Sequence, residues 1–313
     1  MILIWGLAAD TPLAAVRACL ERRKSEFVFL DQQADGHAEI NLTVDDNVRG
    51  TLISNDFALN LDDVSAVYLR PCDLQKVSVG EKADLSNPYL QRVIAFQEAM
   101  VCWTEMTGAL VVNRPSAMAS NNSKPFQSSL IKLAGMDVPE TLITTDPKAV
   151  LEFQKSHGTI IYKSISGTRS IVSKFSSLHL DRLCDVSACP TQFQEYIDGI
   201  DYRIHVVGDA VFGAEITCDA ADYRYAEMQG ASVEIRPFNV PDRLADQCRE
   251  LTASLGLYLA GIDFRCTRSG RWCCFEVNPS PGFTYYQNVT GQKISDSIAD
   301  LLGAGSETNR KLF

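Results

Sequence analysis

The sequence predicts an α/β (α+β) fold built from more than one subdomain, and three observations support this. Short apolar runs alternate with helix-like segments through the first third of the chain, as in a parallel sheet covered by helices. The last third instead contains two predicted β-hairpins. With 313 residues, of which 46% are hydrophobic and 22% charged, the chain can bury the cores of two or three packed subdomains.

The first predicted domain, residues 1–115, carries the strand–helix alternation. Apolar runs predict strands, and amphipathic patterns beginning at Pro12 and Pro88 predict helices: strands at 1–7, 27–30, 66–69 and 109–112, and helices at 12–23 and 88–106. This order resembles a small Rossmann-like domain. Residues 6–10, Gly-Leu-Ala-Ala-Asp, lack the Gly-x-Gly-x-x-Gly fingerprint, so dinucleotide binding is unsupported.

Arg70 follows the third of these strands, directly after Tyr68 and Leu69, and Arg114 follows the fourth. The carboxyl ends of strands in an open α/β sheet line ligand crevices, so Arg70 is a candidate substrate-binding residue. Two solvated arginines at strand exits are the alternative.

The second predicted domain spans residues 116–190. Helices are expected at 121–134 and 147–156, ended by Gly135 and Gly158, and strands at 138–143 and 159–163. Lys163 ends the last strand and precedes a loop that contains Ser166 and Gly167. A lysine beside a small, flexible loop can bind phosphates while the backbone N–H groups close over them. An ordinary surface loop is the alternative reading.

The third predicted domain spans residues 191–313 and contains the hairpins. A Gly208-Asp209 turn joins one pair of strands. The expected elements are strands at 191–197, 202–207, 210–216, 261–266 and 272–277, and helices at 241–257 and 290–302.

Oxygen-bearing side chains mark the second hairpin. Glu276 and Asn278 are two residues apart, so on a strand both point to one face, and Asp263 comes from the neighbouring apolar run. Mg2+ takes one or two protein carboxylates and completes its octahedron with nucleotide phosphates and water, which makes ATP the first cofactor to test. Polar residues of two edge strands facing water would be the alternative.

The segment between these motifs offers contacts for a nucleotide. Backbone groups around residues 194–197 could pair with an adenine edge, and a carboxylate at the following turn could bind ribose. Arg203 or Arg236 could meet a γ-phosphate or a reacting carboxylate bidentately. Either arginine could instead be a cross-strand ion-pair partner. His205 lies on the same strand face as Arg203, and a lone histidine of this kind is more often structural.

The order of these parts resembles the ATP-grasp superfamily and, within it, the RimK-like and glutathione-synthetase-like carboxylate–amine ligases. Six pieces match in order over roughly residues 109–302: Asn121-Asn122-Ser123-Lys124, Ile161-Tyr162-Lys163-Ser164, Gln194-Glu195-Tyr196-Ile197, the strand and turn from Asp201 to Asp209, Gly261-Ile262-Asp263-Phe264, and the segment from Phe275 to Gly282. The resemblance implies an ATP-grasp fold preceded by a Rossmann-like pre-ATP-grasp domain.

The resemblance also implies residue roles. Lys124 and Lys163, with the Ser166 and Gly167 loop, correspond to the phosphate-binding groups. Gln194, Glu195, Tyr196 and Ile197 correspond to the adenine-binding hinge, and Asp198 or Asp201 to the ribose-side acid. Asp263, Glu276 and Asn278 correspond to ligands of Mg2+, expected as two ions for which Mn2+ can substitute. Arg203 corresponds to the arginine that steadies the transferred phosphoryl group, with Arg236 in a supporting position.

The reaction that the resemblance implies is ADP-forming: a carboxylate attacks the γ-phosphate of ATP to give an acylphosphate, and an amine then displaces phosphate to give an amide. Residues 222–231 lack the Arg-rich, Gly-Gly substrate segment common in RimK-like enzymes, which argues against polyglutamylation and leaves room for an amino acid or peptide acceptor. Tyr285 would lie beside the metal site, shaping an acceptor pocket or packing the closing helix. An ATP-dependent phosphotransferase and a non-catalytic nucleotide-binding regulatory module are the alternatives.

Composition and net charge limit the kinds of partner that the protein is expected to bind. A net charge of −10 argues against a general nucleic-acid or anionic-membrane binder. The chain start lacks the basic region of a signal peptide, and no run of about 18 apolar residues occurs. A cytoplasmic protein with mostly reduced thiols is expected, acting on small-molecule or peptide carboxylates and amines, and homodimers are common among related folds.

Overall fold

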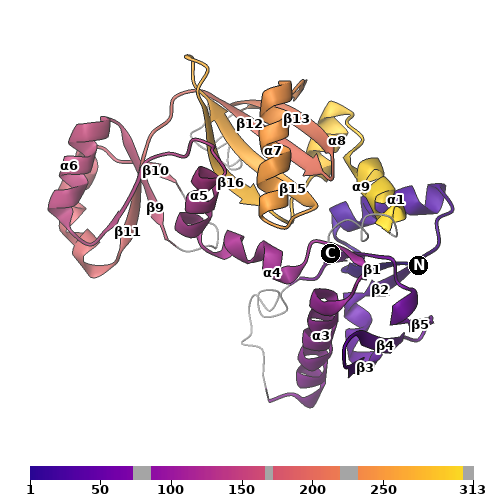
Figure 1. The fold of residues 1–313 in the computed structure, drawn as a ribbon. Coiled ribbons are helices and arrows are strands. Elements are labelled where there is room, and N and C mark those ends of the chain that lie inside the picture. Colours follow the sequence, from indigo (N-terminus) through magenta and orange to yellow (C-terminus); the bar gives the residue numbers. More distant parts are fainter. Residues whose placement is uncertain (73–85, 166–171, 219–231, 306–313) are drawn as a thin grey trace.

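The computed structural model describes residues 1–72, 86–165, 172–218 and 232–305, which form four β-sheets (Figure 1). A parallel sheet and a small antiparallel sheet belong to the N-terminal part. The other two sheets are antiparallel and come from the middle and the last third of the chain. Figure 1 shows three bodies: the N-terminal part with its two sheets, the C-terminal sheet with its helices, and the middle sheet with its helices. The middle sheet lies farthest from the N-terminal part.

The N-terminal sheet has the order β2 (Phe27–Asp31), β1 (Ile2–Gly6), β6 (Ala66–Arg70), β7 (Leu110–Val112), and all its pairings are parallel. Alternate residues of β1 face opposite sides. Ile2 and Ile4 pack with α1 (Thr11–Arg22), whereas Leu3 and Trp5 pack with α3 (Pro88–Met106). The predicted strands, helices and parallel sheet are confirmed.

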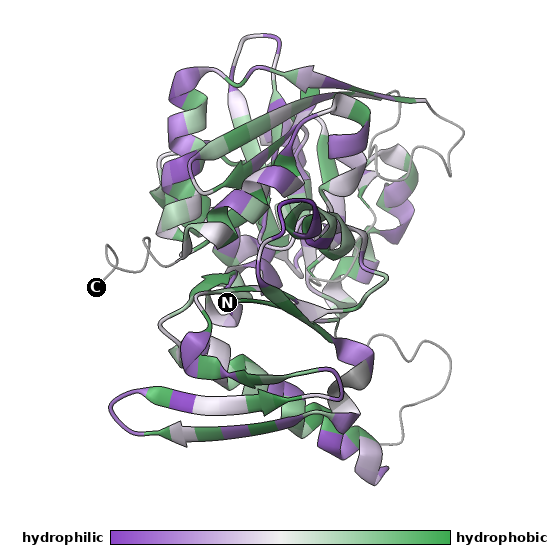
Figure 2. Ribbon diagram, turned by 90° about the vertical axis from the view of Figure 1, so that its right-hand side faces the viewer, coloured by the Kyte–Doolittle hydropathy of each residue, from purple (hydrophilic) through white to green (hydrophobic). Residues whose placement is uncertain are grey.

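A three-stranded sheet in this region was not predicted. It consists of β3 (Glu39–Val44), β4 (Val48–Ile53) and β5 (Ala58–Asn60), flanked by the short 3-10 helices η1 (Gln32–His37) and η2 (Leu61–Asp63). Hydrophobic and hydrophilic residues alternate along the β3–β4 hairpin at the bottom of Figure 2. Leu52 and Leu59 anchor the sheet because both are buried in the α3 side of the core.

The middle sheet has the order β10 (Ser173–Lys174), β9 (Ile160–Ser164), β11 (Thr191–Glu195), β8 (Thr141–Thr144). Val150 of α6 (Pro147–His157) and Leu183 of the 3-10 helix η4 (Ser177–Ala188), which was not predicted, pack on Ile160 and Phe193. The predicted domain boundary after residue 190 divides this sheet, since β11 pairs with both β8 and β9.

The C-terminal sheet has the order β14 (Val233–Phe238), β13 (Ala210–Cys218), β12 (Ile200–Val207), β15 (Leu259–Cys266), β16 (Trp272–Asn278). Ile204 and Val206 of β12 face α7 (Asp242–Ser254) and share their core with Ile131 of α5 (Lys124–Leu133). The opposite face meets α8 (Thr284–Thr290), where Tyr286 packs with Ala214. The alternation therefore turns Arg203 toward the α8 side.

Two predicted helices begin a few residues later than expected. The helix expected at 121–134 is α5, which begins at Lys124 because Pro125 fits the first turn of a helix, and it is preceded by α4 (Pro115–Met118) and the 3-10 helix η3 (Ala119–Asn122). The closing helix expected at 290–302 is α9 (Ile294–Gly303). α8 is a separate helix that was not predicted, and it ends at Gly291, whose φ of 72° lies in the left-handed region.

All ten cysteines are free thiols. Within the described ranges, no helix has both the length and the apolar character needed to cross a membrane.

Candidate active site

A row of charged side chains crosses three neighbouring strands of the C-terminal sheet. Arg203 of β12 lies opposite Asp263 of β15, which lies opposite Glu276 of β16. Directly opposed residues share a face, so the three side chains lie on the α8 face. Arg203 Nη1 donates a 2.7 Å hydrogen bond to Asp263 Oδ1, and their side chains are only 7% and 21% exposed. This row brings together three of the predicted site residues.

Asn278 extends the row, because it lies opposite Gly261, two residues before Asp263. A side chain at residue 261 would collide with Arg203, since a Cβ there would lie 2.7 Å from Arg203 Cζ. Glycine therefore lets the guanidinium lie flat over β15 beside Asp263. Asn278 Oδ1 accepts a 2.9 Å hydrogen bond from the Ser280 N–H, which sets the side-chain amide at the end of β16.

The donor set of this row fits Mg2+. Two carboxylates and an amide oxygen on one face are hard oxygen ligands, and Mg2+ takes few ligands from protein when phosphates supply others. Within the described part of the chain, this row included, no group of three or more His, Cys, Asp or Glu side chains is arranged to hold a metal ion, so the row offers two carboxylates and one amide oxygen.

His205 lies on the same face, opposite Gly261, and is completely buried. Its ring stands edge-on to Tyr286 with the ring centroids 5.1 Å apart, and neither ring nitrogen has a hydrogen-bond partner among the described residues. Burial, together with the charge of Arg203, lowers the pKa of His205 well below its ordinary value. A neutral, packed imidazole fits the structural role expected for it.

The predicted adenine hinge begins in the last two residues of β11 and is held by specific contacts. Gln194 is buried and donates to Thr141 Oγ1 at 3.1 Å. Glu195 Oε1 accepts the Glu140 N–H at 3.0 Å. The hydrogen bonds that fix Tyr196 and Ile197 run from the Tyr196 N–H to Thr159 O at 3.0 Å and from Arg265 Nη1 to Ile197 O at 3.0 Å.

The two candidate ribose acids differ in their surroundings. Asp201 receives a bidentate contact from Arg265, with Nε to Oδ1 at 2.7 Å and Nη2 to Oδ2 at 2.8 Å. Asp198 is 71% exposed and lies 3.9 Å from Arg268. Asp198 is therefore the more accessible carboxylate for a ribose contact, since the Asp201 side chain is only 21% exposed.

The phosphate-binding candidates come from two elements. Lys124 is the first residue of α5, a helix that contacts β16 through Gln127. Lys163 lies on β9, opposite Gln192 of β11. Ser166 and Gly167, and the acceptor segment at 222–231, lie outside the described residues.

Arg236 is not part of the charged row. It lies opposite Glu215, which lies opposite Tyr202, and Tyr202 faces α7. Arg236 is 65% exposed and forms a 2.7 Å ion pair with Glu234. The supporting position beside Arg203 that was expected for Arg236 is therefore not observed, because the two arginines project from opposite faces of the sheet.

Arg70 joins the N-terminal sheet to the turn after β16. Its Nε donates to Asp10 Oδ1 at 2.8 Å, and its Nη1 donates to Ser280 Oγ at 2.9 Å and to Pro281 O at 3.3 Å. Arg70, Asp10 and Ser280 are among the residues that line a cavity of about 360 Å3. Tyr285 is 53% exposed on α8, and its ring lies 5.8 Å from that of Tyr286.

Two buried amides that the sequence did not single out also reach this turn. Gln127 of α5 binds the backbone of Val277, and Asn113, just after β7, binds the carbonyl of Pro279. The one signal available in the sequence was the position of Asn113 at the carboxyl end of a predicted strand.

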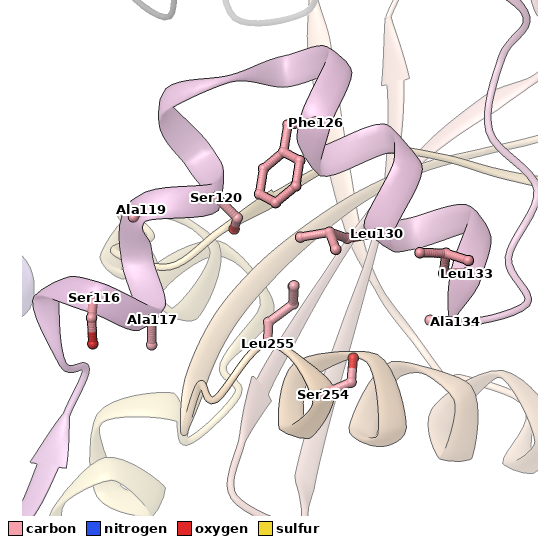
Figure 3. A pocket seen from close by; sticks show the side chains of 10 residues that line it. All are labelled: Ser116, Ala117, Ala119, Ser120, Phe126, Leu130, Leu133, Ala134, Ser254 and Leu255. Atoms are coloured by element: carbon pink, nitrogen blue, oxygen red, sulfur yellow. The ribbon is translucent and has the colours of Figure 1, made fainter.

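A further cavity, of about 480 Å3, has a different character (Figure 3). Apolar side chains line it, with Phe126, Leu130 and Leu133 from α5 and Leu255 just after α7. None of the predicted site residues belongs to its lining.

Comparison with known proteins agrees with this geometry. Residues 120–302, more than half of the chain, match the RimK-like ATP-grasp domain family. The chain is 23% identical over 246 residues to a protein from Vibrio atlanticus (strain LGP32) named probable alpha-L-glutamate ligase, a match that covers 74% of this chain and 81% of that protein.

Solved structures resemble the whole chain. The ATP-grasp ligase PsnB complexed with a minimal precursor has a TM-score of 0.78 and 28% identity, covering 97% of this chain and 99% of PsnB. PsnB complexed with minimal precursor, Mg and ADP gives 0.77 and 26%, covering 98% of each chain. Macrocyclase MdnC from Microcystis aeruginosa MRC, bound with precursor peptide MdnA, shares the fold with a TM-score of 0.78 at 22% identity, covering 96% and 99%.

The charged row, the order of the sheets and these similarities agree: the chain belongs to the RimK-like ATP-grasp family and is an ATP-dependent ligase that joins a carboxylate to an amine.

Proposed function

We propose that the protein activates a carboxylate of a peptide or amino acid as an acylphosphate, with release of ADP, and couples it to an amine. The row of Arg203, Asp263 and Glu276 across three strands carries this proposal. It combines a fixed cationic donor with metal-binding carboxylates, which are the groups that phosphoryl transfer requires.

Asp263, Glu276 and Asn278 would hold Mg2+, in the form of two ions for which Mn2+ can substitute. Bound there, the metal would neutralise charge on the nucleotide phosphates. Lys124 and Lys163, with the loop that contains Ser166 and Gly167, would bind the phosphates. Residues 194–197 would bind adenine, with Asp198 rather than Asp201 on the ribose.

Arg203 would stabilise the phosphoryl group during transfer. Its guanidinium is buried, bonded to Asp263 and held over Gly261, so little rearrangement is needed when charge develops nearby.

The kind of substrate is proposed from the relatives. PsnB and MdnC, which resemble the chain over nearly its whole length, were solved with precursor peptides. A peptide is therefore the first substrate to test, as donor, acceptor or both. Tyr285 is exposed beside Tyr286, whose ring centroid lies 5.9 Å from Arg203 Cζ, and Tyr285 is the candidate acceptor contact. Arg70 already makes hydrogen bonds to Asp10, Ser280 and Pro281 and would shape the acceptor side indirectly. The ten free thiols support a reducing, cytoplasmic setting.

The test is a coupled assay with Mg2+, ATP and a panel of amino acids and peptides. A ligase releases orthophosphate only when a carboxylate and an amine are both present, and it forms one amide per ADP. If the phosphate stays on the acceptor, the protein is a phosphotransferase and the proposal is wrong. If nucleotide binds without any ADP formation across the panel, a regulatory module is the better description.

A further inference from the structure

The end of β16 is held by a side chain from outside its own sheet. β16 is the last strand in the order of the C-terminal sheet, so β15 is its only strand neighbour there. Outside the sheet, Asp137 forms an isolated bridge with Cys273 in the first half of β16, and Gln127 of α5 binds the strand near its end. The Val277 N–H donates to Gln127 Oε1 at 2.9 Å, and Gln127 Nε2 donates to Val277 O at 2.8 Å. Gln127 is 2% exposed, so water does not compete for these bonds.

A second buried amide holds the chain just beyond Asn278. Asn113 Nδ2 donates to Pro279 O and to Leu259 O, both at 2.7 Å. Asn113 Oδ1 accepts the Tyr258 N–H at 2.8 Å and the Leu259 N–H at 3.1 Å. The amide thus makes four hydrogen bonds, its full capacity, and ties the turn after β16 to the start of β15.

We infer that Asn113 and Gln127 are positioning residues that fix the backbone on both sides of Asn278 and so set the metal site, an inference that rests on the proposed function. Residue 277 is fixed by one amide and residue 279 by the other, while the side chain of Asn278 is oriented by the Ser280 N–H. Mg2+ requires nearly ideal octahedral geometry at about 2.0–2.1 Å, so a ligand at the end of an outer strand needs such support.

Asn113 adds a connection between domains. It follows β7 of the N-terminal sheet and precedes residue 120, where the match to the ATP-grasp family begins. The N-terminal sheet thereby contributes a group that supports the metal site without touching the metal or the nucleotide.

The test uses Mn2+ as the probe, with its affinity in the presence of ADP measured by electron paramagnetic resonance. Gln127→Met and Asn113→Leu keep the side-chain volume roughly but remove the hydrogen bonds. Each is expected to weaken Mn2+ binding about 10-fold or more, the usual effect of losing a group that orients a metal ligand. The affinity for ADP without metal should stay within about twofold, since that measurement does not depend on Asn278.

Gln292→Met is the matched control. Gln292 also donates an amide hydrogen bond to a strand of the same sheet, from Nε2 to Gly213 O at 2.8 Å, but on β13, away from Asn278. It should leave the Mn2+ affinity unchanged. If Asn113→Leu does not fold, Asn113→Asp replaces it, because it keeps the acceptor for the Tyr258 and Leu259 N–H groups while losing the donor to Pro279 O and Leu259 O.

Asn278→Ala distinguishes a failure of the positioning inference from a failure of the metal assignment. If it weakens Mn2+ binding while Gln127→Met and the Asn113 variant bind Mn2+ as the wild type does, the positioning inference is wrong and the metal assignment stands. If Asn278→Ala itself binds Mn2+ normally, the metal assignment in the proposed function is wrong.

Discussion

Substituting Gly261 by alanine tests whether the placement of Arg203 sets the rate. The new Cβ would lie 2.7 Å from Arg203 Cζ and closer still to Nη2, whereas ordinary contact begins at 3.4 Å, so the guanidinium must move by about 1 Å. A misplacement of about 1 Å at a reacting centre costs on the order of 100-fold in rate. We therefore expect Gly261→Ala to lower the rate of ADP formation about 30- to 100-fold, or about 2–2.7 kcal/mol of transition-state stabilisation.

The assay is ADP formation with a carboxylate and an amine that the wild-type protein couples, together with thermal unfolding. Overpacking at a buried position also destabilises by about 1–3 kcal/mol, so the melting temperature should fall while the variant stays folded. Gly303→Ala is the control, because a Cβ at Gly303 meets nothing within 4 Å. An unchanged rate in Gly261→Ala would refute the reasoning. So would a further loss when Gly261→Ala is added to Arg203→Ala, because the collision is then absent.

Three further predictions follow from the site. Glu276→Ala should lower Mg2+-dependent ADP formation about 100-fold or more, because metal ions supply several kcal/mol of transition-state stabilisation. Its circular dichroism spectrum and its metal-free nucleotide binding should stay near wild type, and normal turnover would exclude Glu276 as a ligand. Arg236→Ala should change ADP formation less than about twofold, because the side chain is exposed on the opposite face; a large loss would return it to the active site. His205→Phe should remove part of the acid sensitivity of the fold. Because the pKa of His205 is lowered by burial, the unfolded state binds a proton first as the pH falls below about 6.5, and wild type should lose up to about 1.4 kcal/mol of unfolding free energy per pH unit there. Urea unfolding at pH 7.5, 6.5 and 5.5 should give a smaller pH slope for the variant than for wild type, and equal slopes would contradict this.

The sequence was most informative where one pattern determines an element. The buried strands β1 and β6 are continuous apolar runs, and α1 and α3 each begin at an Asp or Asn cap with a proline in the first two helical positions. The sheet of β3, β4 and β5 escaped prediction because its strands are half exposed and bury few side chains. Its stability depends on contacts with α3, which lies far along the chain.

The site shows the same division between local and non-local information. The spacing of Glu276 and Asn278 placed them on one face, and the structure adds that Asp263 is directly opposite Glu276, just before a register shift at Phe264. The sequence could show that Arg236 and the buried Ile235 point to opposite faces of β14. It could not show whether Arg236 and Arg203 share a face, because that depends on how β13 pairs with β12 and with β14.

The contacts of Arg70 and Asn113 bear on how such ligases can be recombined. Both residues belong to the N-terminal part, and both hold the turn from Pro279 to Pro281. A chimera that takes its first 115 residues from a relative must therefore reproduce an arginine and an amide at these strand ends. Exchanging the N-terminal part to alter substrate choice would otherwise loosen the turn that follows Asn278.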